Sequence, residues 1–253
     1  MLAAPFNRAN RAMAHINRSR MHPAAMSGSR AICRKAIMTN NAHAQHAERV
    51  LAHYDELAAI YDSRWITYLD TSHDWALNRL KDLPEGARVL DLACGTGLLL
   101  ERLHNQRPDL ELVGNDGSTA MLEVARRRLP HIELRQDNID GAQAGKNESG
   151  SYDAVLSMSV LHHLNYGDAH LAHIHDLARM DGMVLLCDFA INTLMLRLAE
   201  YWWRLGHPAH TQAYSMRALA NKIHAKDNFV IAESELLKPN KFWRIQAWNL
   251  KSQ

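Results

Sequence analysis

Short apolar runs alternate with helical patterns over the middle of the chain. Five runs have the length and composition of β-strands: 88–93, 110–115, 132–136, 152–158 and 182–189. Three segments between them repeat their apolar positions every three to four residues, as helices do: 97–106, 118–129 and 166–179. Ser118 is suited to cap the second of these helices, and Pro130 follows its end. Strands that alternate with helices predict a parallel sheet with helices on both faces.

Further elements flank this middle part. Before it, residues 44–64 and 73–82 have the apolar spacing of two helices. After it we expect two helices and then two strands that form an antiparallel pair at the sheet edge: 191–206, 215–226, 229–237 and 242–249. The predicted fold class is therefore α/β, a doubly wound, mostly parallel, seven-stranded and Rossmann-like sheet with a helical N-terminal lid.

The first 37 residues differ in composition from the rest. They hold seven Lys or Arg residues and no acid, and the first acidic residue is Glu48. Such a segment is typical of a mitochondrial transit peptide, but also of a disordered extension or of an upstream start codon with Met38 as the true start. We predict a basic extension over residues 1–43 and one folded domain over residues 44–253.

The folded domain is mildly acidic. Taking the seven basic residues of the tail from the 29 Lys and Arg leaves 22 against 27 Asp and Glu, a net charge of −5, which gives no general attraction to nucleic acid. The three cysteines have no metal-like spacing and are typical of reduced thiols. No apolar run reaches the roughly 18 residues of a membrane span. We predict a cytoplasmic protein with no nucleic-acid, membrane or metal partner, or a mitochondrial one if residues 1–37 are a transit peptide.

The strongest signal for chemistry follows the first strand of the middle part. Asp91 lies near the end of that strand, and Gly95 and Gly97 follow in a loop. Glycines there let a ligand approach the backbone at the carboxyl end of the sheet, where doubly wound folds bind ligands. The third glycine of a dinucleotide fingerprint is missing, and a carboxylate beside the loop suits a cation better than a pyrophosphate. S-adenosylmethionine (SAM) carries a sulfonium and an ammonium group and has no phosphate.

Two further acids follow the next strands. Asp116 ends the second strand about 20 residues beyond the glycine loop, where an acid accepts hydrogen bonds from ribose hydroxyls. Asp137 follows the third strand, where its carboxylate could accept the amino group of adenine and the backbone at Asn138 could meet the ring nitrogens. Asp116 alone does not separate NAD from SAM, but together with Asp91 and the two-glycine loop it favours SAM.

Two histidines follow the fourth strand. His162 and His163 should face the same crevice as the glycine loop, because the carboxyl ends of parallel strands meet at one edge of the sheet. An imidazole can act as a general base near neutral pH, and His163 is the preferred candidate. The alternative is a structural pair without chemistry.

In order and spacing, these segments resemble the class I SAM-dependent methyltransferases of the small-molecule type. The resemblance covers roughly residues 50–190 and continues more weakly to about residue 250. It implies SAM as the cofactor, bound by a set of residues that includes one tyrosine of the lid: Tyr61, Asp91, Ala93, Gly95, Thr96, Gly97, Asp116, Gly117, Asp137, Asn138 and Ser157.

The resemblance also divides the folded domain into a helical lid over 44–85, a cofactor core over 86–190, and an acceptor-side insertion with the final strands over 191–253. In the insertion, His210 is a second candidate for a general base beside His163. The insertion and the last strand also supply candidates for the wall of an apolar acceptor pocket, although aromatic residues at such spacing are more often core: Trp202, Trp203 and Trp243.

The expected reaction is in-line transfer of the methyl group of SAM to an oxygen, nitrogen or carbon atom of a small organic acceptor. After the fourth strand, amino-group methyltransferases of nucleic acids carry an Asp/Asn-Pro-Pro-aromatic motif, whereas this chain has Ser157-Met158-Ser159. Two alternatives stay open: a non-catalytic SAM-binding partner subunit, and an NAD-dependent oxidoreductase, whose third glycine and Tyr-x-x-x-Lys motif are missing. The oligomeric state is not predicted.

Overall fold

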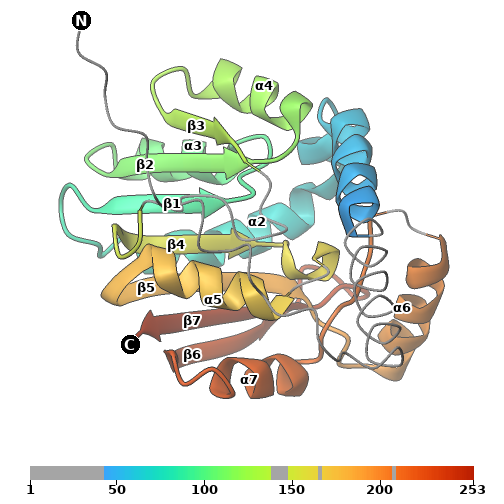
Figure 1. Ribbon diagram of the computed structural model, residues 1–253. Coiled ribbons are helices and arrows are strands. Elements are labelled where there is room, and N and C mark those ends of the chain that lie inside the picture. Colours follow the sequence, from blue (N-terminus) through green and yellow to red (C-terminus); the bar gives the residue numbers. More distant parts are fainter. Residues whose placement is uncertain (1–42, 138–147, 165–166, 207–208) are drawn as a thin grey trace, which may run out of the picture. The chain divides into compact units, whose positions relative to one another are not determined.

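The computed structural model describes residues 43–137, 148–164, 167–206 and 209–253 (Figure 1). The chain divides into two compact units, Met1–Ala44 and Gln45–Gln253. The second unit carries a seven-stranded sheet and the helices that cover it (Figure 1). Asn138 and most of the polar stretch 141–150 lie outside the described residues, so the structure says nothing of them.

The sheet confirms the predicted fold class. Its strand order is β3-β2-β1-β4-β5-β7-β6, with β1 to β5 parallel and β7 antiparallel to both β5 and β6. The two final strands form the predicted antiparallel pair at one edge. The strand bounds are β1 Arg88–Leu92, β2 Glu111–Asp116, β3 Glu133–Gln136, β4 Tyr152–Met158, β5 Ala178–Phe189, β6 Phe229–Leu237 and β7 Ile245–Ser252.

Helices cover both faces of this sheet. In the second unit, residues 45–57 are helical, and a short 3₁₀ turn, Leu161–His163, follows β4. The other helices are α2 Tyr61–Leu80, α3 Leu98–Gln106, α4 Thr119–Arg128, α5 Gly167–Leu177, α6 Leu194–Gly206 and α7 Met216–His224. Ser118 caps α4 as predicted, because its Oγ accepts a hydrogen bond from the Met121 amide at 3.1 Å.

Two apolar cores lie on opposite faces of the sheet. One packs α2 and α3 against strand residues such as Val89 and Leu185, and the other packs α5 and α7 against their neighbours Leu90 and Leu186. Successive residues of a strand point to opposite faces, so a run that is apolar at every position fills both cores. This explains why the middle strands lack an alternating polar pattern.

The helical lid differs from the prediction. The structure has one helix up to residue 57, a turn at residues 58–60, and the 20-residue α2, in place of helices over 44–64 and 73–82. Apolar residues keep their helical spacing through the turn at residues 58–60, so the sequence pattern alone does not reveal the turn. Asp62 ties the start of α2 to the glycine loop and to α4, since its carboxylate accepts hydrogen bonds from Thr96 and Arg128 at 2.6 and 2.7 Å.

The fifth strand begins four residues earlier than predicted. The pairing of β5 with β4 shifts between Tyr152↔Ala178 and Ala154↔Met183, so β5 carries an irregularity at its start. Asp181 there has φ 58°, and a Cβ atom on Gly182 would lie 2.7 Å from the Arg179 carbonyl oxygen. The bulge therefore needs a glycine at position 182. The strand takes up residues 178–179, which were predicted to end the preceding helix, and residues 180–181, which lay between predicted elements.

Candidate functional site

Three adjoining pockets lie at the carboxyl ends of the central strands. The carboxyl ends of β1, β2 and β4 point toward the helix over 45–57 and the start of α2 (Figure 1). We name the pockets the glycine-loop cleft, the Asp91 cavity and the aromatic pocket. Tyr61 and Ser159 line all three, so these two residues mark the point where the pockets meet.

The glycine-loop cleft lies between the helix over 45–57 and the ends of β1, β2 and β4. Its empty volume, including the part open to solvent, is about 730 Å³. Its wall brings together predicted cofactor residues from three separate segments: Tyr61, Ala93, Gly95, Asp116 and Gly117. The remaining wall is largely apolar and includes Leu51, Met121 and Met158.

Asp116 links β2 to the glycine loop. Its Oδ2 accepts a hydrogen bond from the Gly95 amide at 2.9 Å, and its Oδ1 accepts one from the Ser118 amide at 2.8 Å. Burial raises the pKa of Asp116, while these backbone hydrogen bonds lower it. Each carboxylate oxygen keeps a second lone pair, so Asp116 can still accept two hydroxyl groups of a ligand in the cleft.

Asp91 is one of the polar groups in the wall of the Asp91 cavity. The residue is 2% exposed, and its Oδ1 is buried with no hydrogen-bond partner among the described residues. Burial, and secondly the charge of Asp116, raise the pKa of Asp91 to about 8. A buried oxygen without a donor costs free energy, and a cationic donor in this cavity would remove that cost. Thr96 and Tyr61 also line the cavity.

Two residues other than glycine adopt left-handed backbone conformations at the ends of neighbouring strands. Ala93 follows β1 with φ 60°, and Ser159 follows β4 with φ 61°. Such a conformation costs about 1–2 kcal/mol for a residue with a Cβ atom, and strain of this kind gathers at functional sites. Both residues line the site, and the Ser159 hydroxyl donates a hydrogen bond to the Tyr68 oxygen at 2.9 Å.

Gly97 shows why the glycine loop needs its second glycine. It precedes α3 with φ 75°, and a Cβ atom there would lie 3.1 Å from Leu129 Cδ1 and 3.2 Å from Ala125 Cβ. Both the backbone conformation and the close packing against α4 therefore exclude a side chain. The fold places Gly97 behind the loop, where it supports the cleft without lining a pocket.

Besides Gly97, two more of the predicted cofactor residues line none of the three pockets, Asp137 and Ser157. The backbone of Asp137 makes two contacts. Its carbonyl oxygen lies 3.4 Å from Asn115 Nδ2, and its amide donates a hydrogen bond to the Asp116 carbonyl oxygen at 3.1 Å. Ser157 is fully buried, and its Oγ lies 2.8 Å from Nε2 of His170. Asp137 is still next to the cleft through Asp116, whereas Ser157 faces the packed interior.

The aromatic pocket shares one wall with the glycine-loop cleft. Its empty volume is also about 730 Å³, counted in the same way. Seven aromatic side chains line it: Tyr54, Tyr61, Trp65, Tyr68, Phe189, Trp203 and Trp243. Trp203 and Trp243 stack with ring centres 5.2 Å apart and an angle of 22° between their planes. Two of the three predicted tryptophans therefore line this pocket, whereas Trp202 is 70% exposed.

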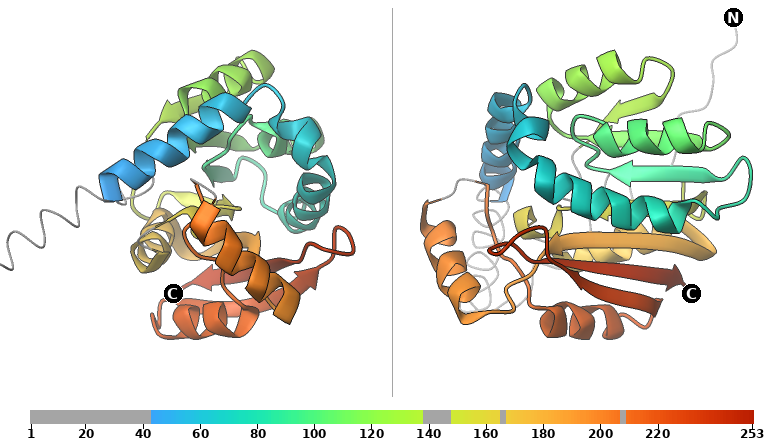
Figure 2. Two further views of the ribbon diagram at one scale, coloured as in Figure 1. Left: turned by 90° about the vertical axis from the view of Figure 1, so that its right-hand side faces the viewer. Right: turned by 180° about the vertical axis from the view of Figure 1, so that it is seen from behind.

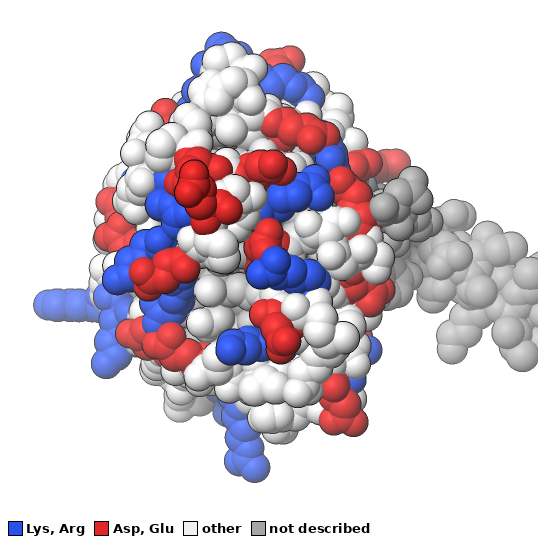
Figure 3. Space-filling view, turned by 90° about the vertical axis from the view of Figure 1, so that its left-hand side faces the viewer, with Lys and Arg blue, Asp and Glu red and all other residues white. Residues whose placement is uncertain are grey.

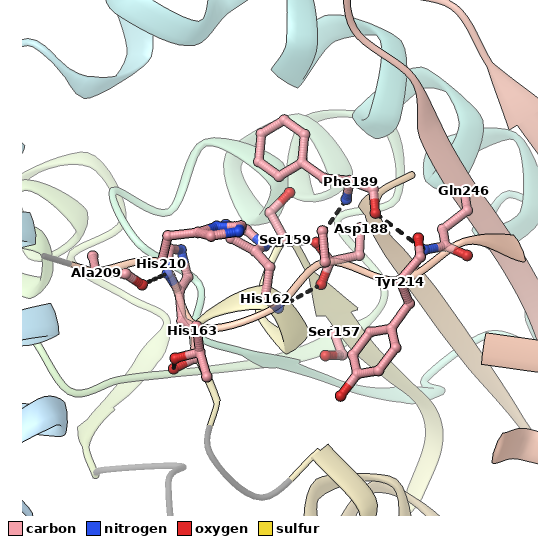
Figure 4. Close-up of polar contacts among 12 residues, drawn as sticks. Ser157, Ser159, His162, His163, Asp188, Phe189, Ala209, His210, Tyr214 and Gln246 are labelled. Carbon is pink, nitrogen blue, oxygen red and sulfur yellow. Dashed lines mark hydrogen bonds and ion pairs between the residues drawn. The ribbon is translucent and has the colours of Figure 1, made fainter. Parts of the chain in front are cut away.

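His162 lines that pocket and forms a buried pair with Asp188. Nδ1 of His162 lies 2.6 Å from Oδ1 of Asp188, and Oδ2 of Asp188 accepts the His162 amide at 3.0 Å (Figure 4). A carboxylate only accepts hydrogen bonds, so the hydrogen is on Nδ1 and the lone pair of a neutral ring is on Nε2. Within the described part of the chain, Nε2 of His162 makes no hydrogen bond.

Both ring nitrogens of His163 already have partners. Nδ1 donates to the Ala209 carbonyl oxygen (Figure 4), and Nε2 accepts a hydrogen bond from the Tyr54 hydroxyl at 2.5 Å. Burial, and secondly the charge of Tyr61, raise the pKa of Tyr54 well above its usual value, so this phenol stays protonated. His163 therefore holds Tyr54, which lines both the cleft and the aromatic pocket.

His210 is one of four histidines that line the aromatic pocket, with His53, His162 and His163. Its Nε2 lies 2.6 Å from Oε2 of Glu200 on α6, and both residues are largely buried. Glu200 also accepts the Ala213 amide at 2.9 Å. Figure 4 shows the rings of His162, His163 and His210 gathered on one side of Asp188. Sequence reasoning gave His162 a lesser role than His163 and did not find Asp188 or Glu200.

The chain and its fold are similar to known proteins. A model of a methyltransferase domain matches residues 90–184. The carboxy-S-adenosyl-L-methionine synthase of Campylobacter hominis is 28% identical over 196 residues, which cover 72% of this chain and 80% of the synthase. A magnesium protoporphyrin IX methyltransferase from Synechocystis, solved with bound S-adenosylhomocysteine (SAH), has a TM-score of 0.58 and 25% identity, covering 74% of this chain and 84% of that one.

These findings support a class I SAM-dependent methyltransferase. SAM is its cofactor, as predicted. One relative of this methyltransferase acts on RNA: the mouse tRNA (carboxymethyluridine(34)-5-O)-methyltransferase is 31% identical over 130 residues, half of this chain but 17% of that protein. The family therefore does not by itself decide the acceptor.

Two further findings concern only the described residues of this methyltransferase. They contain no group of three or more His, Cys, Asp or Glu side chains that could hold a metal ion. None of their helices combines the length and the apolar character that crossing a bilayer requires.

Proposed function

We propose that this methyltransferase methylates an oxygen or nitrogen atom of a small, flat organic molecule, with His162 as the general base. The observation that carries the proposal is the bond between His162 and Asp188, because the His162 ring lines an aromatic pocket that meets the proposed cofactor site at Tyr61 and Ser159. A base in that position can take the proton that a hydroxyl or amino group must lose, a contribution of roughly 10²–10⁴ in rate.

The residues of the other two pockets fit SAM. The unpaired oxygen of Asp91 suits the α-ammonium group of the methionine part, and the lone pairs of Asp116 suit the ribose hydroxyls. When bound, SAM supplies an electrophilic methyl group on a sulfonium. We assign further cofactor contacts to residues that line these pockets, namely Tyr61, Ala93, Gly95, Thr96 and Gly117.

The walls of the aromatic pocket favour a conjugated acceptor. Faces and edges of Trp65, Phe189 and Trp243 surround one volume, with ring centres 5.2–6.4 Å apart. Aromatic rings of a ligand gain from such offset and edge contacts beyond simple burial. The polar groups in this volume are imidazoles and tyrosine hydroxyls, which orient a ligand through a few hydrogen bonds.

The face at the amino ends of the parallel strands, opposite the candidate site, is not a basic surface suited to nucleic acid. Lys, Arg, Asp and Glu stand side by side there (Figure 3). Several of the arginines are paired with acids, among them Arg88 with Glu111 at 3.3 Å and Arg107 with Asp109 at 2.6 Å. Binding to phosphates needs a continuous basic surface, and this face is neutralised by its own ion pairs.

The other histidines have supporting roles in this proposal. His163 fixes the Tyr54 hydroxyl between the cofactor cleft and the aromatic pocket, so we infer that it positions both ligands. His210 is held by Glu200, and the centre of its ring lies 5.9 Å from that of Trp203. Both residues stay candidates for contact with the acceptor. The cytoplasmic location inferred from the cysteines also stays a prediction.

The test is turnover. Purified full-length protein is incubated with SAM and a panel of flat phenols, amino-heteroaromatics and carboxylic acids, together with a short RNA, and SAH formation is measured. We expect SAH to form with at least one aromatic hydroxyl or amine and not with the RNA. SAH formation with RNA alone would overturn the proposal. Tight binding of SAH without turnover on any acceptor would instead favour a non-catalytic partner subunit.

A further inference from the structure

Helix α6 exposes a wide apolar face. Six of its large apolar side chains are 54–74% exposed: Leu194, Met195, Leu198, Tyr201, Trp202 and Leu205. At 3.6 residues per turn, these positions fall within an arc of about 120°. An exposed apolar stripe of this kind on one helix marks an interaction surface. The left view of Figure 2 shows α6 in front of the other described elements.

The opposite face of α6 points into the protein. Leu196 and Glu200 are buried, and Glu200 holds His210 of the aromatic pocket. Trp203, on the same face, lines the pocket and stacks on Trp243. The inner side chains of α6 thus form part of the aromatic pocket, so α6 is anchored while its outer face stays apolar and open.

A cationic turn lies beside α6. The stacking of Trp203 on Trp243 places the β6–β7 turn next to the helix, and that turn exposes Lys238, Lys241 and Phe242. Phe242 is 65% exposed. Over residues 190–206 and 238–244 the sequence has five Lys or Arg residues and a single acid, Glu200, which is buried. The apolar face is therefore accompanied by positive charge.

We propose that the outer face of α6, with Phe242 and the β6–β7 turn, docks on the surface of an anionic lipid bilayer. Tyr201 and Trp202 are of the types that settle at the level of lipid head groups, and leucines can enter the acyl region below. Lys238 and Lys241 match anionic head groups in charge. With 13 residues, α6 is about 20 Å long, so it can lie in the interface but is too short to cross it.

Docking through α6 would place the aromatic pocket next to the membrane. This step rests on the proposed function: the acceptor would then be an aromatic amphiphile dissolved in the bilayer, which reaches the pocket past the inner face of α6. The docking surface itself does not depend on the identity of the acceptor. Composition alone predicted no membrane partner, and this docking surface would replace that prediction.

Vesicle binding tests the proposal directly. Full-length protein is sedimented with vesicles of phosphatidylcholine alone and of phosphatidylcholine mixed with phosphatidylglycerol, without SAM or acceptor. We expect binding to the mixed vesicles, and a loss of roughly tenfold or more in the double variant Leu198→Ser/Trp202→Ser, which removes two exposed apolar groups. Met180→Ser is the matched control, because Met180 is 73% exposed at the start of β5, away from α6.

Each other outcome overturns the proposal. The proposal is wrong if the wild-type protein fails to bind mixed vesicles. It is also wrong if the double variant still binds them, because the basic amino-terminal segment would then be sufficient for binding. A dimer in sedimentation velocity that the double variant disperses, without vesicle binding, would make this face an interface between copies. Unchanged SAH binding shows that the variants are folded. Loss of vesicle binding with intact methyl transfer would separate this proposal from the proposed function.

Discussion

The His162 ring and the Asp188 carboxylate are joined by two hydrogen bonds that connect the segment after β4 to the end of β5. One bond runs from the ring at 2.6 Å and the other from the His162 amide at 3.0 Å. The amide bond fixes the backbone, and the ring bond fixes the orientation and tautomer of the imidazole. The pair therefore presents one nitrogen of a preset ring at the aromatic pocket.

Replacing either member should impair catalysis while leaving cofactor binding intact. We expect His162→Gln to lower kcat for the best acceptor by roughly 10²–10⁴. Asp188→Asn should also lower kcat, because an amide can turn its NH₂ group to the ring and favour the wrong tautomer. The measurement is SAH formation at saturating SAM, with SAH affinity determined by calorimetry in parallel.

His224→Gln is the control for these variants, since His224 is exposed at the end of α7. It should change neither rate nor affinity. Full activity of His162→Gln would show that the base lies elsewhere, and His163→Gln and His210→Gln should then be assayed first.

Asp116 should account for a large part of cofactor affinity. We expect Asp116→Ala to weaken SAH binding by about 1–3 kcal/mol, the cost of leaving buried donors unpaired. The Gly95 amide loses its acceptor in the same variant, so the loop itself is weakened. Calorimetric titration measures the effect, and Asp74→Ala, an exposed site on α2, is the control. Equal affinity in both variants would remove Asp116 from the binding site.

Cofactor affinity should depend on pH through Asp91. Its pKa of about 8 means that the carboxyl is protonated in the free protein at neutral pH. If Asp91 must ionise to bind an ammonium group, SAH binding releases a proton, and the affinity should rise by up to about tenfold per pH unit as the pH increases from 5.5 to 7.5. Asp91→Asn should abolish this slope. Calorimetry in buffers of different ionisation enthalpy measures the released proton, and wild-type binding without proton release would contradict the assignment.

Alanine variants of Gly86 and Gly97 should distinguish the cost of backbone strain from the cost of crowding. Gly86 and Gly97 have similar φ values of 72° and 75°, but only Gly97 has atoms near the place of a Cβ. We expect Gly86→Ala to lower the free energy of unfolding by about 1–2 kcal/mol. Gly97→Ala should lower it by about 2–4 kcal/mol, because crowding against Leu129 and Ala125 adds to the strain. Urea unfolding measures both, and equal losses would show that α4 can move aside.

The sheet could be predicted because each strand is defined by its own residues. Apolar runs bounded by glycines and polar residues located all seven strands, and the rule that parallel strands share one carboxyl edge brought Asp91 and Asp116 together correctly. The Asp116 carboxylate indeed bonds the Gly95 amide. Local periodicity and topology were sufficient to bring these two acids and the glycine loop to one edge of the sheet.

The aromatic pocket could not be predicted in the same way, because it depends on contacts between distant segments. Asp188 is an acid inside an otherwise apolar strand end, which is a signal, but the sequence does not show that it faces His162 26 residues earlier. The apolar residues of α6 give a helix, but they do not tell which face is packed. The structure shows Trp203 inside and Trp202 outside, although the two are neighbours in the chain.

Tyr61 and Ser159 belong to the walls of all three pockets, and this has a consequence for steady-state kinetics. In the proposed arrangement, a ligand in the aromatic pocket contacts side chains that also enclose SAM. An acceptor that bound before SAM would therefore obstruct the entry of SAM. We therefore expect a compulsory order, with SAM first to arrive and SAH last to leave. SAH should then inhibit competitively against SAM and non-competitively against the acceptor, a pattern that initial-rate measurements alone can reveal.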